Sequence, residues 1–282
     1  MSETVSLGGV PVTTPDAADM RLAGLIWGDT GCGKSTLAST APGTKLFVMF
    51  DPDGALSLSD RADVRVLDLS DRNPTLVMGE FRKEDPFTLR RYLTDRPELE
   101  TVVVDSVTTL AYMALQEAVT AAPNKKSTME APGINGYAWR NATILRICTT
   151  MMQITKRLNR NILFLTHENA PERDLEGRVT SITMALSEGT ANQVGLRLNE
   201  VWWMKDNNGS REISIRPCQL RKPMKSRLFI GDKTTFTWHY NPETLIGEGI
   251  ADWFHAWQHN GGKKIPLPTV AIHARSKGGV KK

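Results

Sequence analysis

Residues 28–35 read Gly28-Asp29-Thr30-Gly31-Cys32-Gly33-Lys34-Ser35, a complete G-x-x-x-x-G-K-[ST] phosphate-binding loop. The apolar run at 22–27 predicts a buried strand before the loop, and residues 36–39 continue as a helix. Glycines in such a loop let backbone N–H groups turn inward around phosphates, at the positive end of the following helix. The sequence therefore predicts that residues 28–35, together with Thr36, bind a nucleoside triphosphate.

The motif also assigns the two cofactor contacts. The Lys34 ammonium is expected to reach the β- and γ-phosphates of ATP, and the Ser35 hydroxyl to hold Mg²⁺. A second apolar run, Val102-Val103-Val104, delivers Asp105 about seventy residues after the loop. An acid at the end of a buried strand is the second signature of a phosphate-loop ATPase, so we expect Asp105 to complete the Mg²⁺ site.

Hydrolysis also needs a group that orients or deprotonates the attacking water. Three carboxylates are candidates by position. Asp51 and Asp53 follow the apolar run 45–50, and Glu168 follows His167 after the run 161–166. The residue pattern alone leaves these alternatives open, and each could instead be a solvated loop acid or a helix cap.

Composition limits the class of protein. The chain has 282 residues, 40% hydrophobic and 23% charged, which is ordinary for a soluble globular domain. No apolar run approaches the roughly 20 residues that span a bilayer, and the N-terminus lacks the apolar core of a signal peptide. The three cysteines, Cys32, Cys148 and Cys218, have no metal-binding spacing. We expect a protein of the reducing cytoplasm.

The alternation of apolar runs and helical patterns predicts an α/β fold with a mostly parallel central sheet covered by helices. After residue 198, short strand patterns at 201–204, 212–215, 227–230 and 236–238 predict an antiparallel C-terminal extension. A helix is expected at 86–96, a long one at 140–159 and a closing one at 249–259. The chain then divides into a flexible leader at 1–20, an ATPase core at 21–260 and a flexible basic tail at 261–282.

The tail carries six Lys or Arg residues and no acid from Lys263 to Lys282. It is interpreted either as a solvated, disordered end or as a segment that adds affinity for nucleic acid phosphates. His255 and His259 have the i, i+4 spacing of metal ligands but no third ligand nearby, so a surface pair is the preferred reading. The tryptophans at 202, 203, 238, 253 and 257 are expected to build a second core around the C-terminal strands.

Three segments together resemble RecA-like recombinases. Residues 103–110 resemble their Walker B segment, residues 50–56 the segment after the second strand, and residues 164–167 the strand whose terminal polar residue senses the γ-phosphate. The resemblance spans roughly residues 22–230 and implies that Asp53 stands where the family has a water-activating Glu. It also implies that His167 stands where bacterial members have Gln. Both are departures from the family pattern.

The resemblance gives a role to two stretches without regular pattern, 119–139 and 169–192, which correspond to the loops that line the DNA channel in RecA-like filaments. It implies single-stranded DNA contacts by cations and aromatic rings. The implied residues are Lys125, Lys126, Tyr137, Trp139 and Arg140 in the first loop and Arg173 and Arg178 in the second. For Trp139, a role as a core anchor of the following helix is the alternative.

A Lys-x-Arg pair late in the domain reaches the neighbouring subunit's γ-phosphate in several ring and filament ATPases of this superfamily. Lys225 and Arg227 look like that pair, which implies a ring or filament of identical subunits. A basic surface strand is the alternative. In length the chain resembles the compact RecA-like ATPases of phages, AAA-domain proteins grouped with single-strand annealing recombinases (the fourth Sak group).

The implied function is ATP-dependent binding of single-stranded DNA with annealing or strand exchange, alongside a single-strand DNA-binding protein. A nucleotide-gated loader or assembly ATPase that acts on a protein partner is the alternative. A small-molecule kinase is disfavoured, because no Arg-rich lid suited to an acceptor phosphate is found.

Overall fold

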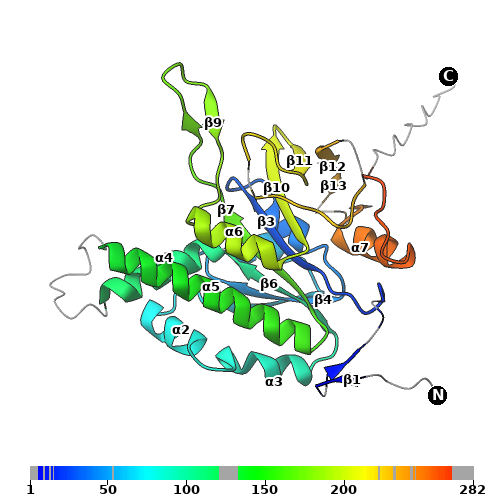
Figure 1. The fold of residues 1–282 in the computed structure, drawn as a ribbon, viewed down its shortest axis with the longest axis horizontal. Coiled ribbons are helices and arrows are strands. Elements are labelled where there is room, and N and C mark those ends of the chain that lie inside the picture. Colours follow the sequence, from blue (N-terminus) through cyan, green and yellow to red (C-terminus); the bar gives the residue numbers. More distant parts are fainter. Residues whose placement is uncertain are drawn as a thin grey trace, which may run out of the picture.

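A central sheet of eight strands, in the order β12-β11-β10-β3-β7-β6-β4-β5, organises the molecule (Figure 1). The computed structural model describes residues 6–8, 10–12, 14, 16–52, 54–120, 133–221, 223–230, 233–241, 244 and 246–268. The strands are β3 (Ala23–Gly28), β4 (Thr44–Met49), β5 (Val64–Asp68), β6 (Leu99–Asp105), β7 (Asn161–His167), β10 (Glu200–Asn207), β11 (Ser210–Ser214) and β12 (Thr235–Trp238). Strands β10 to β5 are parallel, whereas β11 and β12 are antiparallel. The predicted α/β fold, a mostly parallel central sheet covered by helices with an antiparallel C-terminal extension, is confirmed.

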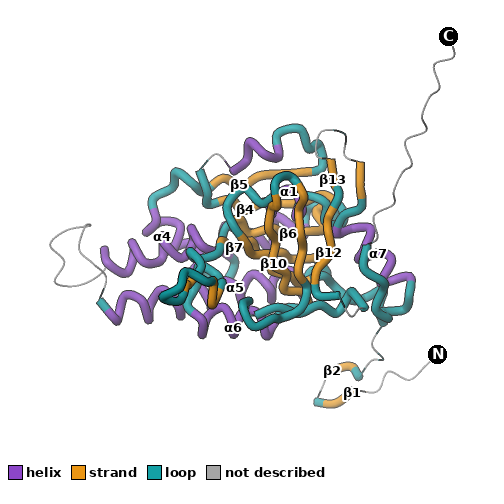
Figure 2. Tube along the Cα trace, turned by 90° about the horizontal axis from the view of Figure 1, so that it is seen from above, coloured by secondary structure: helices purple, strands orange, loops and turns teal. Residues whose placement is uncertain are grey.

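Helices cover both faces of this sheet, which is why its central strands β3, β4, β6 and β7 are buried along most of their length. One face carries α2 (Pro74–Phe81), α3 (Leu89–Thr94), α4 (Val107–Thr120), α5 (Ile134–Arg157) and α6 (Glu188–Arg197). The other face carries α1 (Lys34–Ala38), the short 3-10 helix η1 (Gly54–Leu58) and α7 (Ile250–His259). Figure 2 shows the sheet between α4–α6 on one side and α7 on the other.

Small elements complete the described chain. A second 3-10 helix, η2 (Pro86–Thr88), precedes α3. Three two-stranded pairs lie outside the main sheet: β1 (Ser6–Leu7) with β2 (Val10–Pro11), β8 (Glu172–Arg173) with β9 (Val179–Ser181), and β13 (Tyr240–Asn241) with β14 (Ile246–Gly247). The β8–β9 hairpin projects away from the body of the molecule (Figure 1). Within the described residues, no helix is long and apolar enough to cross a membrane.

An aromatic cluster forms the core on the α7 face. The Phe229 ring lies 6.0 Å from Trp202, 5.4 Å from Phe236 and 5.7 Å from Trp253, measured between ring centroids. Four of the five tryptophans expected in this second core belong to it, namely Trp202, Trp238, Trp253 and Trp257. The fifth, Trp203, follows Trp202 on the same strand and therefore points to the opposite face, into the α2–α6 core.

Several expected boundaries were wrong for local reasons. The long helix begins at Ile134, not at 140, because its first turns are exposed and carry no apolar stripe. The helix expected over 86–96 is split, since Phe87 and Thr88 adopt positive φ angles of 51° and 53°. Residues 227–230 form no strand of the sheet, and only an isolated bridge joins Phe229 to Ile265. That bridge packs residues beyond 260 against the core, and Ile265 is buried.

The stretch 169–192, expected to be irregular, contains the β8–β9 hairpin and the start of α6. Part of the stretch 119–139 is helical, because α4 extends to Thr120 and α5 begins at Ile134. Helix α2 had no counterpart among the sequence predictions. Its first turn is held by the Asn73 side chain, which accepts a hydrogen bond from Thr75 N, and by Pro74 at the first helical position.

The aromatic cluster predicts a stability effect. Phe229→Ala should reduce the free energy of unfolding by about 3–5 kcal/mol, because it removes a fully buried ring and leaves a cavity. Ile230→Ala is the matched control: its side chain is 54% exposed, and the loss should stay within about 0.5 kcal/mol. Urea denaturation followed by tryptophan fluorescence measures both, and equal losses would show that the cluster is not the core of this face.

Candidate functional site

The phosphate loop occupies the turn between β3 and α1. Gly31 and Gly33 have φ angles of 77° and 97°, in the left-handed region that favours glycine. Gly28 is required for a different reason, since a Cβ there would lie 2.0 Å from the carbonyl oxygen of Met204 on β10. These three glycines allow the loop to curl tightly at the carboxyl end of its strand.

Lys34 lies inside this curl. Its ammonium donates hydrogen bonds to the carbonyl oxygens of Gly28 (3.1 Å) and Asp29 (2.7 Å), and the residue is buried. Two loop carbonyls therefore hold the cation beside the backbone N–H groups of the loop. This is the position from which a lysine can contact the phosphates of a nucleotide.

Ser35 and Asp105 meet across the space between the loop and β6. The Ser35 hydroxyl donates to Asp105 Oδ2 at 2.6 Å. Burial raises the pKa of the Asp105 carboxyl, and the Ser35 hydrogen bond offsets only part of that rise. Among the described residues no Lys, Arg or His forms an ion pair with Asp105. A buried carboxylate beside a hydroxyl fits the oxygen ligands that Mg²⁺ prefers. Bound there, Mg²⁺ would neutralise phosphate charge during hydrolysis.

A chain of hydrogen bonds runs from the phosphate loop to β4. Strand β7 lies between β3 and β6, so His167 at its end stands beside Thr30 of the loop. His167 Nε2 donates to Asp51 Oδ2 (3.2 Å), because a carboxylate only accepts, and Nδ1 lies within hydrogen-bond distance of the Thr30 hydroxyl (3.3 Å). Asp51, two residues after β4, thus joins the loop through a histidine.

Asp51 is the carboxylate at this edge that His167 contacts. Its Oδ1 accepts from the hydroxyls of Ser106 (3.1 Å) and Thr109. Burial by itself would raise the pKa of Asp51, but the hydrogen bonds from His167 and Thr109 outweigh burial and lower it. The side chain therefore stays ionised, and Oδ2 retains a lone pair that is free to accept a hydrogen bond from water. Asp53, the position singled out by the family resemblance, lies outside the described residues.

Glu168 lies on the other side of the loop entrance. Its backbone N–H donates to Gly28 O (3.1 Å), and its carboxylate accepts from the indole N–H of Trp203 (2.7 Å). Burial raises its pKa, partly opposed by the Trp203 hydrogen bond. Glu168 therefore also faces the phosphate loop, and it contacts neither His167 nor Asp51 through a hydrogen bond.

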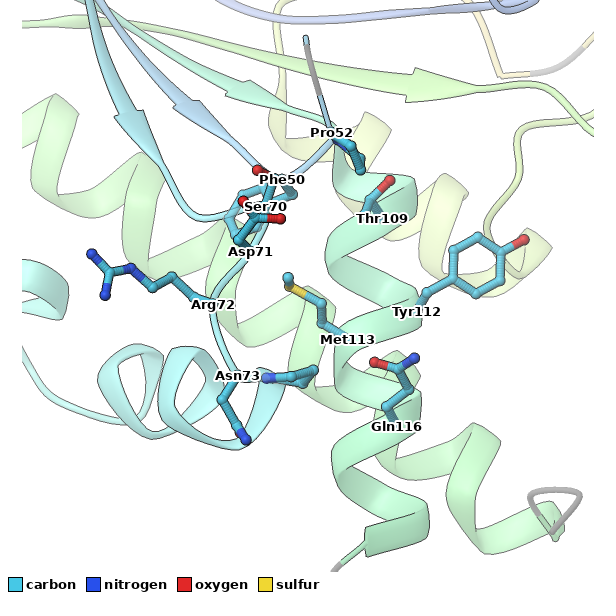
Figure 3. A pocket seen from close by; sticks show the side chains of 11 residues that line it. Phe50, Pro52, Ser70, Asp71, Arg72, Asn73, Thr109, Tyr112, Met113 and Gln116 are labelled. Atoms are coloured by element: carbon cyan, nitrogen blue, oxygen red, sulfur yellow. The ribbon is translucent and has the colours of Figure 1, made fainter. Parts of the chain in front are cut away.

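A pocket of about 550 Å³ opens beside Phe50 and Pro52, the two neighbours of Asp51 in the chain, between α4 and the segment that follows β5 (Figure 3). Its lining combines Phe50, Pro52, Ser70, Asp71, Arg72, Asn73, Pro74, Thr109, Tyr112, Met113 and Gln116. Thr109 belongs both to the pocket wall and to the hydrogen bonds of Asp51. The pocket therefore shares a side chain with the edge of the sheet that carries Asp51, Asp105 and His167, which we call the hydrolytic edge. Sequence patterns gave no sign of this pocket, because its walls are distant in the chain.

Lys225 and Arg227 lie away from the loop of their own subunit. The Lys225 backbone forms a bridge to Val201, and the Lys225 ammonium donates to Leu196 O at 3.3 Å. Val201 pairs with Leu25, three residues before Gly28, which places the bridge about 10 Å below the loop along the strand. Arg227 is exposed, and its backbone N–H donates to the buried Glu200 carboxylate (2.7 Å).

The residues implied in DNA binding fall in three places. Lys125 and Lys126 lie outside the described residues. Tyr137, Trp139 and Arg140 lie on the first turns of α5, and the two rings are 44% and 50% exposed, which disfavours Trp139 as a core anchor. Arg173 and Arg178 lie on the β8–β9 hairpin, where Arg178 pairs with Glu176 at 2.7 Å and Arg173 donates to Gly177 O.

Metal-ligand chemistry elsewhere is not supported. His259 Nδ1 contacts the His255 backbone oxygen at 2.7 Å, as a surface pair would. In the part of the chain that the structure describes, no group of three His, Cys, Asp or Glu side chains is arranged to hold a metal ion.

Comparison with known protein families identifies the domain. The family model described as an AAA domain matches residues 20–219, which include the loop, Asp51, Asp105 and His167. The chain belongs to this AAA domain family. It is therefore a nucleotide-binding ATPase domain with a phosphate loop. No protein in a search of curated sequences matches it.

Among solved structures, this AAA domain protein is similar to the RadB recombinase, seen in a crystal structure. The two share 14% sequence identity and align with a TM-score of 0.42, over 78% of this chain and 88% of the other.

The site predicts separate roles for Lys34 and Asp51. Asp51→Asn should lower the rate of ATP hydrolysis by about 10²–10⁴-fold while leaving the Kd for ATP within a few-fold, because it removes a base and not a phosphate contact. Lys34→Ala should abolish nucleotide binding itself. Single-turnover hydrolysis and titration with a fluorescent ATP analogue measure the two effects.

Asp71→Asn is the control for the Asp51 variant, since it removes an exposed carboxylate from the same pocket wall. Its hydrolysis rate should match that of the unmodified protein. An unchanged rate for Asp51→Asn would transfer the role of base to Glu168 or Asp53.

Proposed function

We propose that this AAA domain protein is an ATPase that binds single-stranded DNA and acts in recombination by annealing or strand exchange. It works as a ring or filament of identical subunits, with a single-strand DNA-binding protein as partner. ATP and Mg²⁺ occupy the edge formed by the phosphate loop, Asp105 and Asp51. The observation that carries the proposal is the pair of exposed aromatic rings at the start of α5.

Tyr137 and Trp139 are half-exposed beside a cation. The Arg140 guanidinium lies 5.2 Å from the centre of the Tyr137 ring. Aromatic faces stack on bases and guanidinium groups pair with phosphates, which is the combination that single strands require. Lys125 and Lys126 precede this helix in the sequence and would add phosphate contacts. An apolar surface of this kind has no stabilising role in an isolated subunit.

Helix α4 offers a route from this surface to hydrolysis. It packs beside α5, and it carries both Tyr112, which is 59% exposed in the pocket wall, and Thr109, which donates to Asp51 (Figure 3). A DNA strand bound over the start of α5 and this pocket would shift the position of α4. Through the Thr109 hydrogen bond, that shift would reach Asp51, the carboxylate proposed to activate water. The proposal therefore includes stimulation of ATP hydrolysis by DNA.

The first test is ATP hydrolysis with and without single-stranded DNA. We expect DNA to raise the rate, and the stimulation to fall steeply between about 50 and 200 mM salt, because phosphate contacts release counterions. Trp139→Ala should reduce the stimulation by about tenfold, since stacking contributes roughly 1–3 kcal/mol per base, without changing the rate in the absence of DNA. Leu76→Ala, which removes an exposed apolar side chain from α2, is the control.

The second test concerns the action of Arg227 on a neighbouring subunit. Because Lys225 and Arg227 lie well below their own phosphate loop, they suit a site in another subunit. Arg227→Ala and Lys34→Ala should each be inactive alone, but a mixture should recover part of the activity, since one subunit then supplies the arginine and the other the loop. A mixture that stays inactive would return Arg227 to a surface role.

The alternative function, a nucleotide-gated loader acting on a protein partner, is favoured by the β8–β9 hairpin. Its tip carries a fully exposed Leu175, and residues 172–178 hold three carboxylates against two arginines. Such a charge balance suits a protein surface better than a phosphate backbone. Hydrolysis that ignores DNA at both salt concentrations, while a partner protein binds only with ATP, would establish this alternative.

A further inference from the structure

Arg211 lies at the phosphate loop although 176 residues separate it from Ser35 in the chain. It stands near the start of β11, where it pairs in register with Asp206 of β10 and Trp238 of β12. Alternate residues of a strand share a face, so Arg211 lies on the same face as Ile213, which packs in the α1–α7 core. This face carries α1, the helix that the loop opens.

The Arg211 guanidinium packs directly against the loop. A Cβ added to Gly33 would lie 2.9 Å from Arg211 Nε and 3.0 Å from Cζ. Gly33 immediately precedes Lys34, so the two cations flank one turn of the loop. The absence of a side chain at Gly33 therefore allows the guanidinium to approach the phosphate-binding backbone closely.

No acceptor satisfies this guanidinium within the described part of the chain. Arg211 Nη1 is buried and has no hydrogen-bond partner, and no carboxylate forms an ion pair with the side chain. Its cross-strand neighbour Asp206 accepts from Gly209 N instead, at 2.7 Å. The Trp238 ring, 5.5 Å from Arg211 Cζ, holds the other side of the group. A buried, unpaired N–H costs free energy that an anionic ligand would recover.

The position of Arg211 indicates which part of a nucleotide it meets. Asp51, Asp105 and His167 lie on the β7–β6–β4 side of β3, so the γ-phosphate and the attacking water belong there. Strands β10 and β11 lie on the opposite side of β3. A nucleotide with its terminal phosphate among the carboxylates must extend its other end toward β11.

We propose that Arg211 binds the α-phosphate of the nucleotide, and so fixes the nucleoside end of the ligand in the same subunit. The inference requires nucleotide binding at the phosphate loop but not the proposed role on DNA. It gives the site a second cation, placed across the loop from the hydrolytic edge.

The test measures Kd by NMR titration for ATP, ADP, AMP and adenosine. Arg211→Ala should raise the Kd of ATP, ADP and AMP by a similar factor, about tenfold to hundredfold, because a charge-assisted hydrogen bond is lost from a group that all three ligands share. Adenosine should bind Arg211→Ala and the unmodified protein equally. Lys34→Ala should instead affect the ligands unequally, with a large loss of affinity for ATP and little change for AMP.

Two variants keep the test interpretable. Lys205→Ala removes an exposed cation from β10 near the same edge and should leave all four Kd values within about twofold. Arg211→Lys keeps the charge but loses the planar fork, and should show an intermediate loss with an unchanged melting temperature.

Other outcomes would overturn the proposal. A loss confined to ATP would place Arg211 at the γ-phosphate, and an equal loss for adenosine would place it at the base or ribose. Unchanged Kd values for both Arg211 variants would show that the side chain only supports the loop by packing against it. Because these titrations need no DNA, failure of the DNA-directed function would not affect them.

Discussion

The parallel pairing of β3, β7, β6 and β4 is the constraint on which the site depends. Parallel strands end at the same edge, so residues far apart in the chain meet there without any loop having to carry them. Because β7 lies between β3 and β6, His167 spans the gap from Thr30 to Asp51 with its two ring nitrogens. A shift of β7 by one residue would turn His167 to the other face and break this connection.

Negative and positive side chains also offset one another at this edge of the sheet. Asp51, Asp105 and Glu168 gather where phosphates and Mg²⁺ are expected, and the negative charge of Asp51 adds to the burial that raises the pKa of Asp105. Lys34 opposes them from inside the loop, held by two carbonyl oxygens. Arg211 adds a permanent cation at the far side of the same loop, which keeps positive charge along the whole length that a triphosphate would occupy.

Sequence patterns were sufficient to predict those parts of the fold that are determined by contiguous residues. The apolar runs, the glycine motif and Asp105 were identified because the central strands β3, β4, β6 and β7 are buried along most of their length and each signature is contiguous. Asp51 could not be told apart from Asp53 and Glu168, since its contact with His167 depends on β7 lying between β3 and β6. The start of α5 was missed because exposed helical turns carry no apolar stripe. Arg211 had no signal at all, as only the sheet order brings β11 to the loop.

The residues on the two sides of β3 therefore have different roles in the site. On the β11 side, Trp238 is buried in the aromatic core and its ring packs against Arg211. On the β4 side, Asp51 depends on hydroxyl groups of α4, a helix with one wall open to a pocket. A ligand of that pocket would contact Thr109 and Tyr112 on the open side of α4, whose opposite side packs in the core, and would act on Asp51 through the Thr109 hydroxyl. Regulation of hydrolysis is therefore expected to act through α4 and to leave nucleotide affinity unchanged.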